Sequence, residues 1–245
     1  MAVVQSTITC RTDSCGCQSG KGLFQVRWAG AQRMVLGGDI RGHVPLAPLA
    51  GQSHLYGLGP LEELKGEITI LHSEPSISRV QEDKRVSVEA GFNHRACFLV
   101  YSQVASWRGV PLPDEVRDLA TLEAVLPELA ARNGIDPKLP FPFLLRGRPA
   151  RIDFHILNKT DGLPHTPELH EKAKVHFAVE HTGVEIIGFH SHEHRGIFTP
   201  RDSNLHLHVR TDDGSISGHV EEITVPGLQL LLPAVVEWRT TVPCS

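Results

Sequence analysis

The chain has 245 residues, of which 40% are hydrophobic, and its formal net charge at pH 7 is -4. The length suffices for one large core or two smaller ones, and the net charge gives no electrostatic reason to expect nucleic acid or an anionic membrane as a partner. No apolar run approaches the ~18 residues of a membrane span, and residues 1–22 do not resemble a secretory signal. We therefore expect a cytoplasmic protein.

Three of the five cysteines, Cys10, Cys15 and Cys17, lie in the polar N-terminal segment. An odd and uneven set argues against a disulfide framework in a chain of this length. The gaps between these cysteines also differ from the two-residue gaps that dominate structural zinc sites. We expect residues 1–22 to be a flexible segment with free thiols.

Strand-like patterns dominate the rest of the chain. They occur at residues 66–71, 85–90, 96–104, 151–157, 184–190, 205–211, 218–225 and 228–236, separated by turns rich in Gly, Pro and Asp. A Pro- and charge-containing stretch over residues 106–142 marks the boundary between two halves. The sequence predicts an α+β protein that is mostly β, with few helices.

Two segments have helical patterns. Residues 119–134 place Leu122, Val125, Leu126 and Leu129 on one face, with Thr121 as the expected cap and Gly134 after the end. Pro127 predicts a kink or break in this helix. A shorter helix is expected within residues 165–174, capped by Thr166 and with Pro167 at its first position.

The segment "LHLHVRTDDGSISGHV", residues 205–220, predicts a hairpin that gathers three histidines. Side chains alternate along a strand, so His206 and His208 share the face opposite the apolar residues of residues 205–211. Asp213-Gly214 predicts a two-residue turn with positive φ at both positions. With that turn, His208 lies opposite His219, and His206 is one diagonal step away.

Three neutral imidazoles on one face match the ligand set of a divalent metal. Zinc is the metal that we expect, although the same ligands also suit copper, nickel or iron. The register places Glu221 opposite His206, either as a fourth polar group of the site or as a bystander. The competing interpretation is an exposed hairpin face with surface histidines.

These residues resemble the C-terminal signature of the α-acetolactate decarboxylases, in which an HxH pair and a histidine in a Gly-Gly-His stretch bind zinc. His206, His208 and His219 reproduce the spacing, with Ser217 in place of the first glycine. Residues 56–71, "YGLGPLEELKGEITIL", resemble the family segment that carries the catalytic glutamate, here Glu67. Residues 184–204 resemble the segment before the histidine strand, and the similarity extends over about residues 33–225.

The resemblance implies two β-sheet domains with a metal site in the groove between them. We divide the chain into the flexible segment 1–22, an N-terminal β domain at 23–110 and a C-terminal β domain at 111–245 that carries the hairpin. The implied reaction is decarboxylation of 2-acetolactate to acetoin. A metal chelated by two substrate oxygens would stabilise the enediolate as a Lewis acid, and Glu67 would supply the proton. The resemblance also implies a small oxyacid substrate and a homodimer.

One departure concerns the arginine that the family uses at the end of a strand. Counting from Gly147 places His155 in that slot, and an imidazole cannot reproduce a two-pronged guanidinium clamp. We expect His155 to contact the substrate, and Arg151 or Arg201 could replace the arginine from another direction.

Two other functions fit the same residues. The metal scaffold could serve different lyase, isomerase or hydrolase chemistry on a related oxyacid. Alternatively, the chain could bind metal without catalysis, with His190, His192 and His194 and the N-terminal cysteines as additional ligands.

Overall fold

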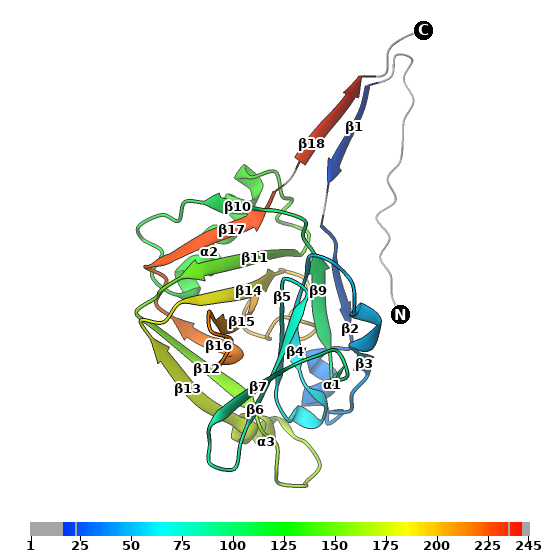
Figure 1. Ribbon diagram of the computed structural model, residues 1–245, viewed down its shortest axis with the longest axis vertical. Coiled ribbons are helices and arrows are strands. Elements are labelled where there is room, and N and C mark those ends of the chain that lie inside the picture. Colours follow the sequence, from blue (N-terminus) through cyan, green and yellow to red (C-terminus); the bar gives the residue numbers. More distant parts are fainter. Residues whose placement is uncertain (1–16, 23, 235, 242–245) are drawn as a thin grey trace.

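Two antiparallel sheets make up most of the fold (Figure 1). The computed structural model describes residues 17–22, 24–234 and 236–241. The six-stranded sheet has the order β2 (Val26–Ala29), β9 (Leu99–Gln103), β4 (Leu55–Pro60), β5 (Glu67–Leu71), β6 (Glu74–Val80) and β7 (Val86–Ala90). The fold is mostly β, as predicted.

The eight-stranded sheet contains both strands of the histidine hairpin. Its order is β10 (Trp107–Val110), β17 (Leu228–Pro233), β11 (Phe141–Gly147), β14 (Val184–His190), β15 (Leu205–Thr211), β16 (Ser217–Ile223), β12 (Arg151–Leu157) and β13 (Lys174–Glu180). Two further pairs join β3 (Val44–Pro45) to β8 (Arg95–Ala96) and β1 (Cys17–Gly22) to β18 (Val236–Thr241). The described strands change sheet between Gln103 and Trp107, whereas the domain boundary at residue 110 stays a prediction.

The central strands β14 and β15 of the eight-stranded sheet are buried on both faces. Leu205, Leu207 and Val209 of β15 pack with Leu122 and Leu126 of helix α2 (Leu119–Arg132) in one core. On the other face, side chains from both sheets form a second core that includes Tyr56, Leu58, Leu144, Ile187 and Phe189. The histidine face of β15 is therefore covered by the six-stranded sheet, and the competing interpretation of an exposed hairpin face is wrong.

The two main helices are present, and α2 corrects two predictions. Asp118 is its N-cap and accepts a hydrogen bond from Thr121 N at 2.8 Å, so Thr121 lies one turn inside the helix, in a capping box. Pro127 does not interrupt the helix, because the apolar face with Leu122 and Leu126 is fully buried and offsets the lost backbone hydrogen bond. Helix α3 (Pro167–Ala173) has the predicted Thr166 cap.

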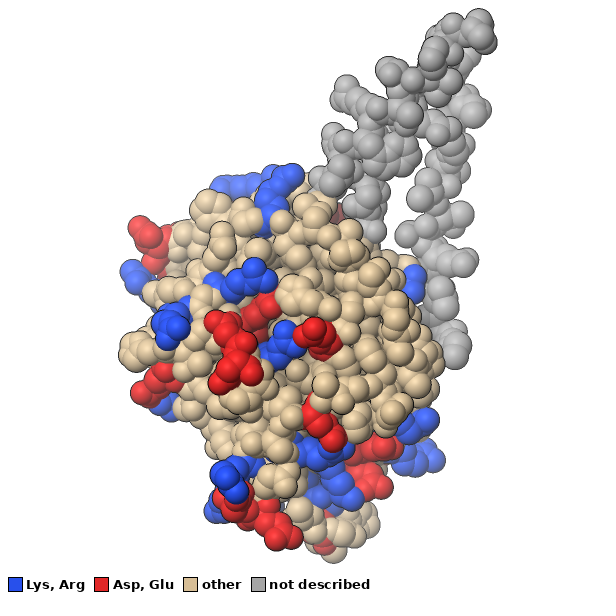
Figure 2. Space-filling view, viewed as in Figure 1, with Lys and Arg blue, Asp and Glu red and all other residues tan. Residues whose placement is uncertain are grey.

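Short elements complete the fold around the site. They are α1 (Gln32–Leu36) and the 3-10 turns η1 (Ala47–Leu49) and η2 (Glu62–Leu64). None of the helices in the described part of the chain is long and apolar enough to span a membrane. Acidic and basic side chains are interspersed over the face shown in Figure 2.

Candidate active site

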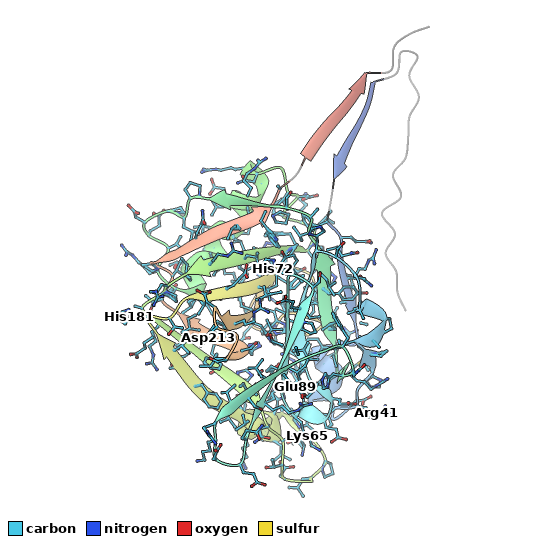
Figure 3. All side chains as sticks on the ribbon, in the orientation of Figure 1. Arg41, Lys65, His72, Glu89, His181 and Asp213 are labelled. Carbon is cyan, nitrogen blue, oxygen red and sulfur yellow. The ribbon has the colours of Figure 1, made fainter. Side chains whose placement is uncertain are left out.

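The hairpin of β15 and β16 has the predicted register. His208 pairs with His219, Val209 with Gly218 and Arg210 with Ser217. The turn type differs from the prediction, because Gly214 has φ 70° while Asp213 does not have a positive φ. Instead, the Asp213 carboxylate accepts hydrogen bonds from Thr211 Oγ1 at 2.7 Å and Ser215 N at 3.0 Å, closing a longer loop at the position labelled in Figure 3.

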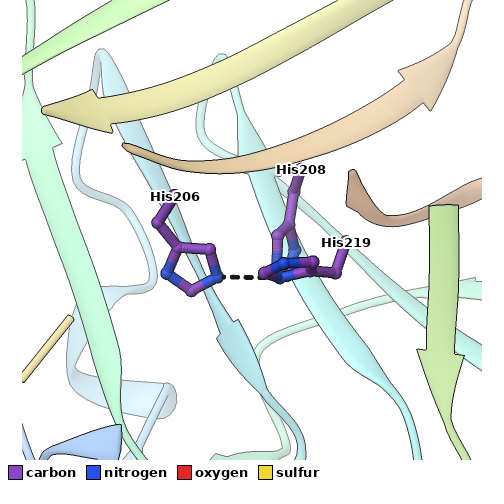
Figure 4. Close-up of side chains that lie close together, drawn as sticks. All are labelled: His206, His208 and His219. Atoms are coloured by element: carbon purple, nitrogen blue, oxygen red, sulfur yellow. Dashed lines mark hydrogen bonds between the residues drawn. The ribbon is translucent and has the colours of Figure 1, made fainter. Parts of the chain in front are cut away.

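The three histidines converge on one point (Figure 4). His206, His208 and His219 each offer a ring nitrogen, and these atoms lie within 4.8 Å of one another. His206 Nε2 and His219 Nδ1 are 3.0 Å apart and share a hydrogen bond. Among the residues that the structure describes, this is the one such group of three or more His, Cys, Asp or Glu side chains.

Neighbouring groups orient two of the rings. His206 Nδ1 donates to the Phe198 carbonyl oxygen at 2.6 Å, which leaves a lone pair on Nε2. His208 Nδ1 lies 3.2 Å from Thr69 Oγ1, which in turn accepts a hydrogen bond from Ser217 Oγ at 2.7 Å. His208 Nε2 is buried and has no hydrogen-bond partner among the described residues.

Burial keeps the three imidazoles neutral. It lowers the pKa of His206 to about 4 and holds the pKa values of His208 and His219 well below the ordinary value. Nearby imidazoles, including His155, lower them further. Neutral imidazole is the form that binds a metal, so the site presents its ligands in the required state.

Glu67 lies at the start of β5, beside the histidines, and is 2% exposed. Its Oε2 is 3.7 Å from His208 Nε2, and its Oε1 is 3.9 Å from His155 Nε2. Burial raises the pKa of the Glu67 carboxyl well above its ordinary value, against the opposing effect of a backbone hydrogen bond from Leu157. Glu67 is therefore a buried carboxylic acid that can donate a proton.

His155 joins the site from β12, next to β16. It pairs with His219 across the two strands, and the two rings stack with centroids 4.5 Å apart. Its Nδ1 lies 3.0 Å from Glu221 Oε1, and this hydrogen bond lowers the pKa of Glu221 to about 2. Burial nevertheless lowers the pKa of His155. Glu221 was expected to be either a fourth polar group of the site or a bystander. It does not line the cavity, but its hydrogen bond orients His155, which does.

A cavity of about 390 Å³ adjoins these residues. Side chains from both sheets line it, including Glu67 of the six-stranded sheet and His155, His206 and His219 of the eight-stranded sheet. Lys174, at the start of β13, and Arg201 also line the cavity. Lys174 is not indicated by any pattern in the sequence. Thr69 could have been found, because it shares a strand face with Glu67.

The other predicted ligands do not join the triad. His190 is fully buried and stacks on Phe141 with centroids 4.7 Å apart, whereas His194 packs edge to face against Trp28. His192 contacts the ring of His190. Cys10 and Cys15 lie outside the described residues, and nothing is described of the Cys17 side chain. None of these three histidines belongs to the group formed by His206, His208 and His219 among the described residues.

Arg151 does not line the cavity. Its guanidinium binds Asp153 at 2.5 Å and Glu180 at 2.6 Å instead. Of the two arginines that could replace the family's arginine, Arg201 alone lies at the cavity.

The fold and the site define a protein of two packed antiparallel sheets with a histidine triad, two of whose members are buried and one partly buried, beside a buried carboxyl group. The chain belongs to the α-acetolactate decarboxylase family, whose sequence profile matches residues 29–245. The family is one of carboxy-lyases, which supports an enzymatic function for the chain. No curated protein sequence matches the chain.

Solved structures share the fold at low sequence identity. An α-acetolactate decarboxylase from Bacillus subtilis strain 168 is 16% identical with a TM-score of 0.66, and the match covers 86% of this chain and 85% of that one. The acetolactate decarboxylase of Bacillus subtilis subspecies spizizenii is 16% identical with a TM-score of 0.65, covering 86% of each chain. A Staphylococcus aureus protein of unknown function, described as similar to the decarboxylase, is 14% identical with a TM-score of 0.62, covering 87% and 85%.

Proposed function

We propose that this chain is a metal-dependent decarboxylase that converts 2-acetolactate, or a similar α-hydroxy-β-keto acid, to acetoin or its analogue and CO2. One observation carries the proposal: three imidazoles converge at a cavity beside a buried carboxyl group whose pKa is raised by burial. Family membership adds the reaction type. A cytoplasmic location and a homodimer remain predictions from the sequence.

The residues present fit a divalent metal. His208 Nε2 is buried without a hydrogen-bond partner among the described residues, and a metal would satisfy it. His206, His208 and His219 are the proposed ligands. Three nitrogen ligands are typical of catalytic zinc sites, which keep one position for water or substrate, so we propose zinc ahead of copper, nickel or iron. When bound, the metal supplies Lewis-acid stabilisation for negative charge on substrate oxygens.

Glu67 is the proposed proton donor. Loss of CO2 breaks a carbon-carbon bond and leaves an electron pair that the adjacent ketone accommodates as an enediolate. Carbon must then take up a proton to give the acyloin, and the buried Glu67 carboxyl holds one next to the triad. Glu67 is 2% exposed at the wall of the cavity, and burial favours the protonated form of its carboxyl group.

His155 is proposed to contact the substrate from the position of the family's arginine. Its hydrogen bond to Glu221 directs Nδ1 toward the carboxylate and leaves Nε2 on the side of Glu67. This tautomer presents a lone pair at Nε2, which can accept a hydrogen bond from a substrate hydroxyl.

The test is the fate of racemic 2-acetolactate with the zinc-loaded protein. We expect CO2 and acetoin to form in equal amounts, and the Glu67→Gln variant to retain zinc but produce little of either. A fully metallated wild-type protein that releases no CO2 would contradict the proposed reaction. Lyase, isomerase or hydrolase chemistry on a related oxyacid would then be the function to pursue, since the arginine slot holds His155.

A further inference from the structure

One lysine and one arginine line the cavity beside the triad, and their surroundings differ. Lys174 Nζ lies 2.8 Å from Glu171 Oε2 and 3.7 Å from Glu221 Oε1, so two carboxylates already compensate its charge. Arg201 is exposed and forms no hydrogen bond or ion pair with any residue in the described part of the chain. Asp202, which follows it, also lines the cavity but makes no described ion pair with Arg201. Arg201 is therefore the uncompensated cation of the cavity.

The segment that carries Arg201 is fixed on both sides. Before it, the Phe198 carbonyl accepts the hydrogen bond from His206 Nδ1 at 2.6 Å. After it, Ser203 Oγ and Asn204 N donate to the Glu123 carboxylate at 2.6 and 3.0 Å. The first of these bonds ties the segment to a proposed metal ligand. Arg201 thus stands between two anchored points, at the rim of the cavity that the triad adjoins.

We infer that Arg201 binds the carboxylate of the substrate, in place of the arginine whose slot holds His155; this inference rests on the proposed function. A guanidinium can bind a carboxylate through two parallel hydrogen bonds, which fix the orientation of the acid and compensate its negative charge. Lys174 is already paired, and Arg151 is engaged by Asp153 and Glu180 away from the cavity. Arg201, on the segment before β15, therefore favours binding of a carboxylic acid over a neutral compound.

The test measures binding, so that it does not depend on turnover. Zinc-loaded wild-type, Arg201→Ala and Arg201→Lys proteins are titrated calorimetrically with 2-hydroxyisobutyrate, an acid without the β-keto group, and with its neutral amide. We expect Arg201→Ala to weaken binding of the acid by roughly ten- to a hundredfold and to leave the amide unchanged, because a hydrogen-bonded charge pair is lost. Arg201→Lys should fall in between, since a lysine keeps the charge without the fork.

The matched control is Arg108→Ala. Arg108 is an exposed arginine on β10 that does not line the cavity, and its removal should change neither affinity. Equal losses for the acid and the amide in Arg201→Ala, or no loss for either, would overturn the inference. Absence of acid binding to the wild-type protein would overturn it too. If acid binding depends on Arg201 but acetolactate is not decarboxylated, the proposed function fails while the inference stands.

Discussion

Glu67 shows how burial alone can prepare a side chain for chemistry. The carboxyl group is 2% exposed, and no hydrogen bond to its Oε1 is described. Desolvation disfavours the charged form, so the proton stays on the group at a pH where an exposed glutamate has lost it. The neutral imidazoles nearby result from the same effect, because desolvation removes protons from histidine and retains them on carboxylic acids.

The Glu67→Gln variant tests the proton-donor role. Glutamine keeps the size of the side chain but cannot deliver the proton, so we expect kcat to fall by about 10²- to 10⁴-fold. The zinc content and KM should change little, because Glu67 is not a proposed ligand. Steady-state acetoin formation and elemental analysis measure these quantities, and a variant with wild-type kcat would exclude Glu67 as the donor.

Glu221 is predicted to act through His155. In Glu221→Gln the charged acceptor of the His155 Nδ1 bond is lost, and we expect kcat/KM to fall several-fold while zinc remains bound. The distinguishing readout is a double-mutant cycle: Glu221→Gln should add little to His155→Ala if both losses act on one imidazole.

The matched control for Glu221 is His176→Ala. His176 Nδ1 also binds Glu221, at 2.8 Å, but its side chain is 61% exposed and this bond does not orient His155. Its loss should leave kcat/KM near the wild-type value. Additive effects of the Glu221 and His155 substitutions, or no effect of His155→Ala, would refute the role given to this pair.

At the scale of elements, close contact between β12 and β16 positions His155 against His219. Gly218 permits it: a Cβ there would lie 2.6 Å from Phe154 Cδ2 and 2.8 Å from the His155 carbonyl oxygen. The carbonyl belongs to the backbone of a paired strand and cannot move without separating the two strands. The stacked pair of rings therefore depends on a glycine in the hairpin.

Gly218→Ala should lower the free energy of unfolding by about 1–3 kcal/mol and weaken zinc binding, because the added methyl group forces β16 away from β12. Denaturant unfolding and zinc titration measure the two effects. Gly109→Ala is the control, since its Cβ would meet the flexible end of Gln229. Equal behaviour of the two variants would show that the close strand contact is unimportant.

The hairpin is the element that sequence reasoning predicts best. Alternation along residues 205–211 and the turn at Asp213 and Gly214 determine which histidines meet, and both are local signals. The strands β4 and β11 were not predicted, because Gly57, Gly59 and Pro142 obscure the strand pattern. Tertiary packing buries all of β4 and the first five residues of β11, which local propensity does not reveal.

The contacts around the site were harder to predict than the triad itself. Glu67 and His155 were identified as site residues from the family resemblance, because no local pattern links residues so far apart in the chain. The pairing of Glu221 with His155 depends on the order of β16 and β12 within the sheet. Sheet order is a long-range property, and hairpin geometry alone specifies neighbours only within one hairpin.

For the whole molecule, the burial of His170 in α3 and His190 in β14 has a consequence for stability. Burial lowers the pKa of His170, which lines the cavity, and of His190, which packs on the other face of the sheet, from 6.5 to about 4. Between these pH values the unfolded chain binds protons that the folded chain does not. The metal-free protein should therefore lose stability as the pH falls from about 6.5 toward 4.

His190→Phe tests this linkage without altering the triad. Phenylalanine can keep the stacking on Phe141 and cannot be protonated, so the slope of unfolding free energy against pH should decrease by close to one proton between pH 4 and 6.5. Urea unfolding of the metal-free wild-type and variant proteins across this pH range measures the slope. An unchanged slope would mean that folding does not lower the pKa of His190.

The whole arrangement of two sheets around the triad is proposed to bind one divalent metal ion. The most direct measurement is a zinc titration of the metal-free protein at neutral pH, followed by calorimetry and native mass spectrometry, with His208→Ala and the exposed-site control His192→Ala. We predict one tight equivalent of zinc in the wild-type and His192→Ala proteins and none in His208→Ala. Full zinc occupancy in His208→Ala, or several tight equivalents in the wild type, would contradict the three-histidine site.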